Sequence, residues 1–285
     1  MRIGAPFRQP EWSAQALTEG PDWVVQAHRN FLDAGAEVVT TNSYALVPFH
    51  IGDERFRNEA SSLASLAGRL AREAVSGSGA SDTVRIAGSL PPLFGSYRPD
   101  LFDAGDAPRI IDPLVAGLAP FVDMWLGETL GSIAEARAVR EALDRGDHSN
   151  LPLWISFTLD DHPNGLLRSG EAVTDAVAAA IDLGAVAVLF NCSQAESIGQ
   201  AIVIAEQVGR DRVMTGGYAN RFVSAHTETG EANEHLSAFR DDLDPAAYCD
   251  IVAEWIATGA TIVGGCCGMT PSHIAAISAL CANLG

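Results

Sequence analysis

Apolar, β-branched runs alternate with amphipathic helical patterns along most of the chain, and this alternation restricts the fold more than any other feature. A strand, a helix and then another strand is the pattern of a parallel sheet with helical crossovers. The strand patterns cover residues 37–41, 84–88, 122–126, 153–157, 185–190, 213–215 and 261–263. The helical patterns cover residues 14–34, 54–75, 110–119, 133–144, 171–183, 197–208, 245–258 and 271–282. The sequence therefore predicts an α/β fold.

Two α/β architectures fit this order of elements. A (β/α)8 barrel has eight strands and begins with one of them, so seven strand patterns predict a TIM-type barrel that lacks its first β-strand at the N-terminus. An open, doubly wound sheet that binds a dinucleotide would carry a glycine-rich phosphate loop after its first strand. The segment TTNSYALVPF, residues 40–49, has no such loop. We therefore expect the barrel.

The connections are too short for a domain linker, except for the loops at residues 90–107 and 220–242. Barrels commonly use a chain of 285 residues as one unit. We therefore expect a single domain over residues 1–285, with the two long loops acting as lids or binding loops.

Charge and hydropathy exclude several kinds of partner. A formal net charge of −18 argues against the basic face that binds nucleic acid or an anionic membrane. No apolar run reaches the roughly 20 residues of a transmembrane helix, and the first residues lack the pattern of a secretory signal. We expect a cytoplasmic protein that acts on small molecules. A homo-oligomer is compatible with the sequence.

The strongest local signal is the run GGCCG, residues 264–268, directly after the last strand pattern. Side chains alternate between the faces of a strand, so adjacent cysteines cannot both reach one atom while the backbone stays extended. The flanking glycines supply the freedom to turn. Cys266 and Cys267 can therefore converge on a metal ion at the C-terminal face, where barrel enzymes place their sites.

A third cysteine, Cys192, follows the strand pattern at 185–190 and ends at the same face. Three protein ligands and one open position are typical of a catalytic zinc site, and thiolates select zinc over magnesium or calcium. We predict that Cys192, Cys266 and Cys267 hold Zn²⁺. The alternative is thiol redox chemistry at Cys266 and Cys267. A disulfide between these neighbours would be strained, and out of place in a reducing compartment.

The other two cysteines and one glutamate complete the set of candidates. Cys249 and Cys281 lie within helical patterns and are expected to pack as small apolar residues. Glu128 follows the strand pattern at 122–126 on the presumed active face. A carboxylate there would be costly unless it bound something cationic. We therefore expect Glu128 to bind a positively charged group.

Five motifs together give a specific resemblance. They are GAEVVTTNSY at 35–44, GSLPP at 88–92, Glu128-Thr129, Asn191-Cys192-Ser193 and GGCCG at 264–268. Over essentially its whole length the chain resembles the homocysteine S-methyltransferase family. The resemblance implies a zinc barrel whose ligands match the three cysteines named above. It also implies that Glu128 binds the amino group of homocysteine, that Thr41 lies by its carboxylate and that Trp12 lies near the methyl donor. Asn191 is grouped with these substrate-binding residues.

The implied reaction is zinc-dependent transfer of a methyl group from a sulfonium donor to the thiol of homocysteine, giving methionine. The betaine enzymes of the family carry a tyrosine after the glutamate, and Thr129 in its place favours S-methylmethionine or S-adenosylmethionine as donor. The family's opening strand, with Asp-Gly-Gly, has no counterpart here. Either the start has been placed late or the protein is a naturally shortened form. A non-catalytic metal-binding barrel is the alternative function.

Overall fold

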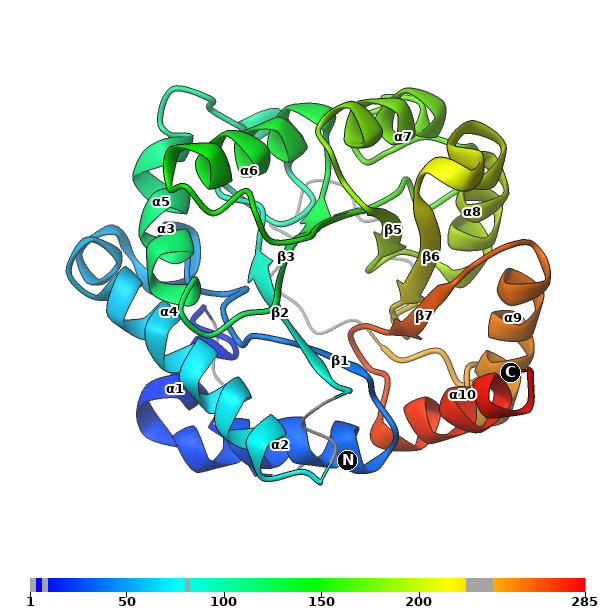
Figure 1. Cartoon of the computed structure of the whole chain (residues 1–285), viewed down its shortest axis with the longest axis horizontal. Coiled ribbons are helices and arrows are strands. Elements are labelled where there is room, and N and C mark those ends of the chain that lie inside the picture. Colours follow the sequence, from blue (N-terminus) through cyan, green and yellow to red (C-terminus); the bar gives the residue numbers. More distant parts are fainter. Residues whose placement is uncertain (1–3, 7–9, 80–82, 224–237, 285) are drawn as a thin grey trace.

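A computed structural model describes residues 4–6, 10–79, 83–223 and 238–284. Within this part of the chain, seven parallel strands form one sheet in the order β1 to β7, so each strand pairs with its neighbours in sequence. Figure 1 shows these strands arranged around a ring, with the helices outside it. The α/β barrel with one strand fewer than eight is therefore confirmed. The strands are β1 (Val38–Thr40), β2 (Arg85–Leu90), β3 (Met124–Leu130), β4 (Leu153–Phe157), β5 (Ala187–Asn191), β6 (Met214–Ala219) and β7 (Ile262–Gly265).

The α-helices of the described residues are α1 (Ala14–Glu19), α2 (Pro21–Asp33), α3 (Pro48–Ile51), α4 (Asp53–Ser76), α5 (Ala107–Leu118), α6 (Ile133–Arg145), α7 (Val173–Asp182), α8 (Ala195–Gly209), α9 (Pro245–Ala257) and α10 (Pro271–Leu284). Short 3-10 turns, η1 and η2, lie at Pro99–Leu101 and Arg210–Arg212. No described helix combines the length and apolar character needed to cross a membrane.

One helix prediction was wrong, and one short helix was missed. The single helix expected over 14–34 is divided into α1 and α2 at Gly20, because Gly20 leaves the helical conformation and Pro21 has no N–H to continue the ladder. The short helix α3 was not predicted. It begins with Pro48 and ends at Gly52, which adopts a left-handed conformation with φ +80°.

Strand β6 is longer than the predicted segment 213–215, because Gly216 and Gly217 weaken the strand pattern in the sequence. Both glycines are needed where they lie. A Cβ on Gly217 would approach Cγ2 of Ile198 in α8 to 2.4 Å, and one on Gly216 would collide with the backbone of β7. These glycines therefore let α8 and β7 pack closely against β6.

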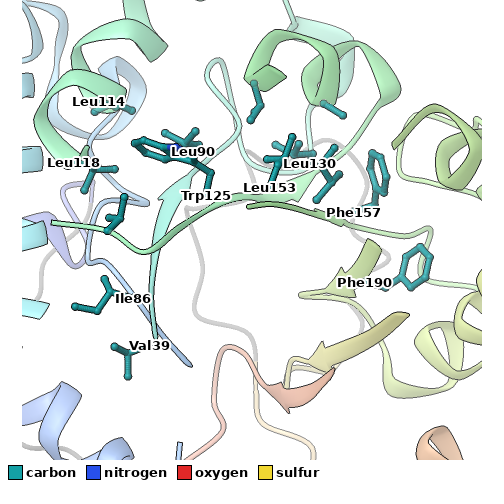
Figure 2. Close-up of a cluster of buried hydrophobic side chains, with 14 of the residues drawn as sticks. Val39, Ile86, Leu90, Leu114, Leu118, Trp125, Leu130, Leu153, Phe157 and Phe190 are labelled. Carbon is teal, nitrogen blue, oxygen red and sulfur yellow. The ribbon is translucent and has the colours of Figure 1, made fainter. Parts of the chain in front are cut away.

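The main core lies between the strands and the surrounding helices (Figure 2). Residues at every second position of a strand point outward into it, and Trp125 and Phe157 are fully buried there. The labelled members are Val39, Ile86, Leu90, Leu114, Leu118, Trp125, Leu130, Leu153, Phe157 and Phe190. A second, smaller cluster consists of Ala87, Met124 and Leu126, with Val38 and Trp154 packed against them. The two clusters occupy opposite faces of the strands, as alternation requires.

The sheet has two edges, β1 and β7. Strand β1 pairs with β2 and strand β7 with β6, and no ladder joins β1 to β7 in the described residues. All residues of β5 are buried, whereas all residues of β7 are half-buried. The strand that leads to Cys266 and Cys267 is therefore an edge strand.

A capping box fixes the turn between β3 and α6. The Ser132 hydroxyl accepts a hydrogen bond from the Glu135 N–H at 3.2 Å, and a Glu135 carboxyl oxygen accepts one from the Gly131 N–H at 2.6 Å. Glu135 is only 4% exposed, and burial raises the pKa of its carboxyl to about 7 from an ordinary value of 4.5. The turn that follows Glu128 thus includes a buried titratable group.

This group should make folding stability depend on pH. Between about pH 4.5 and 7 the folded protein holds a proton on Glu135 that the unfolded chain has lost. Stability from this group is therefore greatest at low pH and falls by about 3 kcal/mol as the pH rises through this range. Glu135→Gln keeps an acceptor for Gly131 and removes the titration. Urea unfolding near pH 5 and pH 8 should show a smaller fall for the variant, and an equal fall would assign the dependence to other groups.

Candidate active site

The three predicted cysteines meet at the carboxyl ends of their strands. Cys192 directly follows β5, and Cys266 and Cys267 directly follow β7. Their sulfurs all lie within 4.8 Å of one another, with 3.8 Å between Cys192 and Cys267 and 4.0 Å between Cys266 and Cys267. Cys192 is buried and the other two are half-buried, and all five cysteines of the chain are free thiols. The predicted convergence is therefore present.

The backbone turn that permits this convergence differs from the predicted one. Cys192 itself adopts a left-handed conformation, with φ +51°, which is uncommon for a residue with a side chain. Cys266 remains tied to β6, because its N–H donates to the Ala219 carbonyl at 2.9 Å. In the GGCCG run the left-handed residue is Gly268, which comes after the cysteines. The turn at β5 thus brings Cys192 to the pair on β7.

The chemistry of this donor set suits a soft divalent metal. Hydrogen bonds from the Cys266 and Cys267 thiols lower the pKa of the Cys192 thiol, and in turn the pKa values of Cys266 and Cys267 are raised. The cluster thus favours a thiolate at Cys192 that accepts hydrogen bonds from the other two thiols. A zinc ion takes thiolate ligands in tetrahedral geometry, and three sulfurs leave one position open. The three cysteines therefore fit the predicted metal.

Glu128 lies near the end of β3, on the inner face of the ring. One carboxyl oxygen accepts a hydrogen bond from the Ser89 hydroxyl of β2 at 2.5 Å, and the other accepts one from the Tyr218 hydroxyl of β6 at 3.3 Å. Burial raises the pKa of Glu128, although the Ser89 hydrogen bond opposes this shift. No salt bridge is found for Glu128 among the described residues. The carboxyl group is therefore held by neutral donors alone.

Thr41 is linked to Glu128 through Ser89. Its hydroxyl oxygen accepts a hydrogen bond from the Ser89 N–H at 3.1 Å and lies 2.8 Å from the Ser43 hydroxyl. Thr41 is buried at the end of β1, beside the strand that carries Ser89. The structure thus places two of the predicted substrate residues, Thr41 and Glu128, in one hydrogen-bond network.

Asn191 uses its amide within the protein. The side-chain oxygen accepts hydrogen bonds from the Thr129 N–H at 3.1 Å and from the Ser156 hydroxyl at 2.7 Å. The side-chain nitrogen donates to the Thr129 hydroxyl at 2.8 Å and lies 3.9 Å from the Cys266 sulfur. This fully buried side chain therefore connects the end of β3 to the cysteines.

Trp12 lies before α1, in a segment that is tied to the end of β1. The Asn42 side chain donates a hydrogen bond to the Ser13 carbonyl at 3.0 Å. The Trp12 ring packs 5.9 Å from the ring of His50 in α3. These contacts place Trp12 beside α3, and its predicted position near the donor stays a prediction.

Sequence reasoning missed three residues at this site: Ser89, Tyr218 and Tyr97. Every second side chain of a strand faces the inside of the ring, and Ser89 in β2 and Tyr218 in β6 occupy such positions. Strand alternation could therefore have identified both residues. Tyr97 lies in the 90–107 loop, and its hydroxyl oxygen is 2.8 Å from the Cys192 sulfur. The predicted role of that loop as a lid or binding loop stays a prediction. Most of the other long loop, 220–242, lies outside the described residues.

Comparisons with known proteins identify the family of this chain. The model of the homocysteine S-methyltransferase family matches residues 3–281. A homocysteine S-methyltransferase of Escherichia coli is 29% identical over 94% of this chain and 87% of that protein, and homocysteine S-methyltransferase 2 of Arabidopsis thaliana is 27% identical over 97% and 88%. A selenocysteine Se-methyltransferase of Brassica oleracea is 28% identical over 97% and 84%.

A solved structure extends the likeness to the fold. The metallated form of the homocysteine methyltransferase MmuM from Escherichia coli superposes with a TM-score of 0.78 and 26% identity, and the match covers 97% of this chain and 91% of that one. The family match, the barrel and the cluster of three cysteines agree with one another. The chain belongs to the homocysteine S-methyltransferase family and is a methyltransferase.

Proposed function

We propose that the protein transfers a methyl group from a sulfonium donor to the sulfur of homocysteine, with a zinc ion held by Cys192, Cys266 and Cys267. The observation that carries this proposal is the group of three cysteine sulfurs within 4.8 Å, in the same barrel mouth as Glu128. The names of the relatives support the acceptor, and the existence of a metallated form of MmuM supports a bound metal.

The acceptor is held at its amino group by Glu128. Homocysteine carries an ammonium group, and Glu128 presents a carboxyl group that accepts hydrogen bonds from the hydroxyls of Ser89 and Tyr218. An ammonium ion would compensate the cost of holding this half-buried carboxylate in the barrel mouth. Thr41, bonded to the N–H of Ser89, lies on the side where the substrate carboxylate is expected.

Zinc, when bound, keeps the acceptor sulfur as a thiolate at neutral pH, where a free thiol with a pKa near 8.5 is mostly protonated. The chain's own residues position the reactants. Glu128 fixes one end of the acceptor while the cysteine cluster fixes its sulfur, so the acceptor's freedom is reduced before the methyl group arrives. The carboxylate and the thiolates make this mouth negative, which favours a cationic donor.

Two sulfonium donors fit, S-methylmethionine and S-adenosylmethionine. Thr129 follows Glu128, and its hydroxyl is engaged by Asn191. A betaine donor is disfavoured by the absence of a tyrosine at this position. The selenocysteine Se-methyltransferase among the relatives makes a selenol the natural second acceptor to assay.

Several expectations stay predictions. These are a single domain over residues 1–285, a cytoplasmic location, action on small molecules without nucleic acid or membrane, and compatibility with a homo-oligomer. The thiol redox alternative at Cys266 and Cys267 also stays open to test, because their sulfurs lie 4.0 Å apart.

Cys192→Ser is expected to lose metal binding and methyl transfer together. Removing one of three thiolate ligands should weaken zinc binding by at least about 100-fold. The matched control is Cys249→Ser, because Cys249 lies in α9 and its thiol contacts the Ala276 carbonyl at 3.5 Å. Zinc per chain and methionine formation from homocysteine, measured with each sulfonium donor, check the prediction.

The control should retain near-stoichiometric zinc and turnover. Wild-type protein that binds zinc without turnover with any donor would favour the non-catalytic barrel. A reversible loss of thiols on mild oxidation, in a wild-type protein that binds no metal, would favour the redox alternative.

Glu128→Gln is expected to weaken acceptor binding and leave the metal in place. The amide oxygen can still accept the hydrogen bond from Ser89, and the amide nitrogen can donate to the Tyr218 hydroxyl oxygen, but the charge that pairs with ammonium is lost. The KM for homocysteine should rise by roughly 10- to 100-fold, which corresponds to a charge-assisted hydrogen bond of about 1.5–3 kcal/mol. Zinc per chain should not change. An unchanged KM would remove Glu128 from the acceptor site.

The same residue predicts a pH dependence. The carboxyl group must be ionised to pair with ammonium, and burial raises its pKa above the ordinary value. Acceptor affinity should therefore weaken on acidification at a higher pH than an exposed glutamate would allow. The pH profile of kcat/KM in wild-type protein and in Glu128→Gln checks this, because the variant should lack that acidic limb.

A further inference from the structure

Tyr97 reaches the cysteine cluster from the loop between β2 and α5. Its hydroxyl oxygen lies 2.8 Å from the Cys192 sulfur, closer than the Cys267 sulfur at 3.8 Å. We propose that Tyr97 is a positioning residue, whose hydroxyl donates a hydrogen bond to Cys192 and thereby holds that sulfur and draws charge from it. This inference rests on the proposed function, in which Cys192 is a metal ligand.

The direction of the hydrogen bond follows from the chemistry of the two groups. A tyrosine hydroxyl carries a proton that it can donate, and a cysteine that binds zinc does so as a thiolate without a proton. When Cys192 binds the metal, the Tyr97 hydroxyl therefore donates its hydrogen bond to a negatively charged sulfur. Such bonds are stronger than bonds between neutral groups.

The loop holds Tyr97 in an unusual conformation. Tyr97 has φ +62°, in the left-handed region that bulky residues rarely adopt. The neighbouring Ser96 hydroxyl lies 2.9 Å from the Tyr44 hydroxyl, which fixes the loop before Tyr97. After Tyr97, Pro99 packs so closely on Gly131 that a Cβ there would meet it at 3.1 Å. The loop is therefore anchored on both sides of the residue that it presents.

The ring of Tyr97 is held as well as its backbone. The Arg168 guanidinium lies over the ring, 5.4 Å from its centre, and is itself paired with Asp161 at 2.8 Å. A cation over an aromatic ring attracts its electron density. This charge should strengthen the hydroxyl as a donor while the stacking fixes the ring. Arg168 thus supports both the position and the donor strength of Tyr97.

The consequence for the cluster is that its sulfurs are not equivalent. Cys192 has an O–H donor at 2.8 Å, whereas Cys266 has the Asn191 amide at 3.9 Å. A hydrogen bond to a metal-bound thiolate lowers the charge that the sulfur gives to the metal, which tunes the metal from outside its ligand set. Tyr97 would therefore influence how strongly the metal attracts the acceptor sulfur.

The test uses the full chain loaded with cobalt(II), whose thiolate complexes absorb light through charge transfer from sulfur to metal. Tyr97→Phe removes the oxygen and keeps the ring under Arg168. Loss of the hydrogen bond raises the energy of the sulfur electrons, so the charge-transfer band should move to longer wavelength. Competition with a chelator should also show zinc binding weakened by about 10-fold, since Cys192 is no longer held.

Cys249→Ser is the matched control, because Cys249 lies in α9 outside the group of three sulfurs and its thiol contacts the Ala276 carbonyl. Its band should match that of wild type. An unchanged band in Tyr97→Phe, or an equal shift in both variants, would overturn the inference. Wild-type protein without any thiolate band would instead refute the proposed metal site.

Arg168→Met provides a second test if Tyr97→Phe does not fold. It keeps the hydroxyl and removes the charge over the ring. A shift in the same direction but smaller than that expected for Tyr97→Phe would support the role of Tyr97. A cobalt band identical to that of wild type would count against it.

Discussion

The ladder that joins β5 to β6 and β6 to β7 determines where the cysteines meet. Asn191 pairs with Tyr218, and Ala219 pairs with Gly265, so the residues that follow β5 and β7 emerge at nearly the same height. A slip of one residue would turn alternate side chains to the opposite face. The close approach of β7 at Gly216 leaves little freedom for such a slip. The geometry of the site therefore depends on the register of these three strands.

Much of the fold could be predicted, because strand and helix periods differ and the chain alternates them clearly. Strand β4 has the predicted bounds, 153–157, since four of its five residues are apolar and a proline, Pro152, precedes it. Helix breaks were harder, as Gly20-Pro21 shows. The convergence of Cys192 with the GGCCG pair could also be predicted, because the carboxyl ends of parallel strands share one face of the sheet.

The network around the cysteines could not be predicted in the same way. Ser89, Tyr218 and Glu128 come from different strands, and which of them touch depends on the tilt and register of the ring. Asn191 was expected at the substrate, yet its amide is fully occupied by hydrogen bonds that connect β3 to the cluster. Polar residues at a strand end are recognisable in a sequence. Whether such a residue binds substrate or makes hydrogen bonds within the protein depends on the three-dimensional arrangement of its neighbours.

The edge position of β7 has a consequence for the dynamics of the site. Among the residues that the structure describes, the four residues of β7 and the three of β1 lack a strand partner on one side, and these stretches are too short to template extended pairing with another chain. Edge strands nevertheless open more readily than central ones, and their amides exchange hydrogen with solvent sooner. Two of the three cysteines follow this strand. An ion that binds only the closed edge would stabilise it by mass action, so occupancy of the cluster and protection of the β7 amides should rise and fall together.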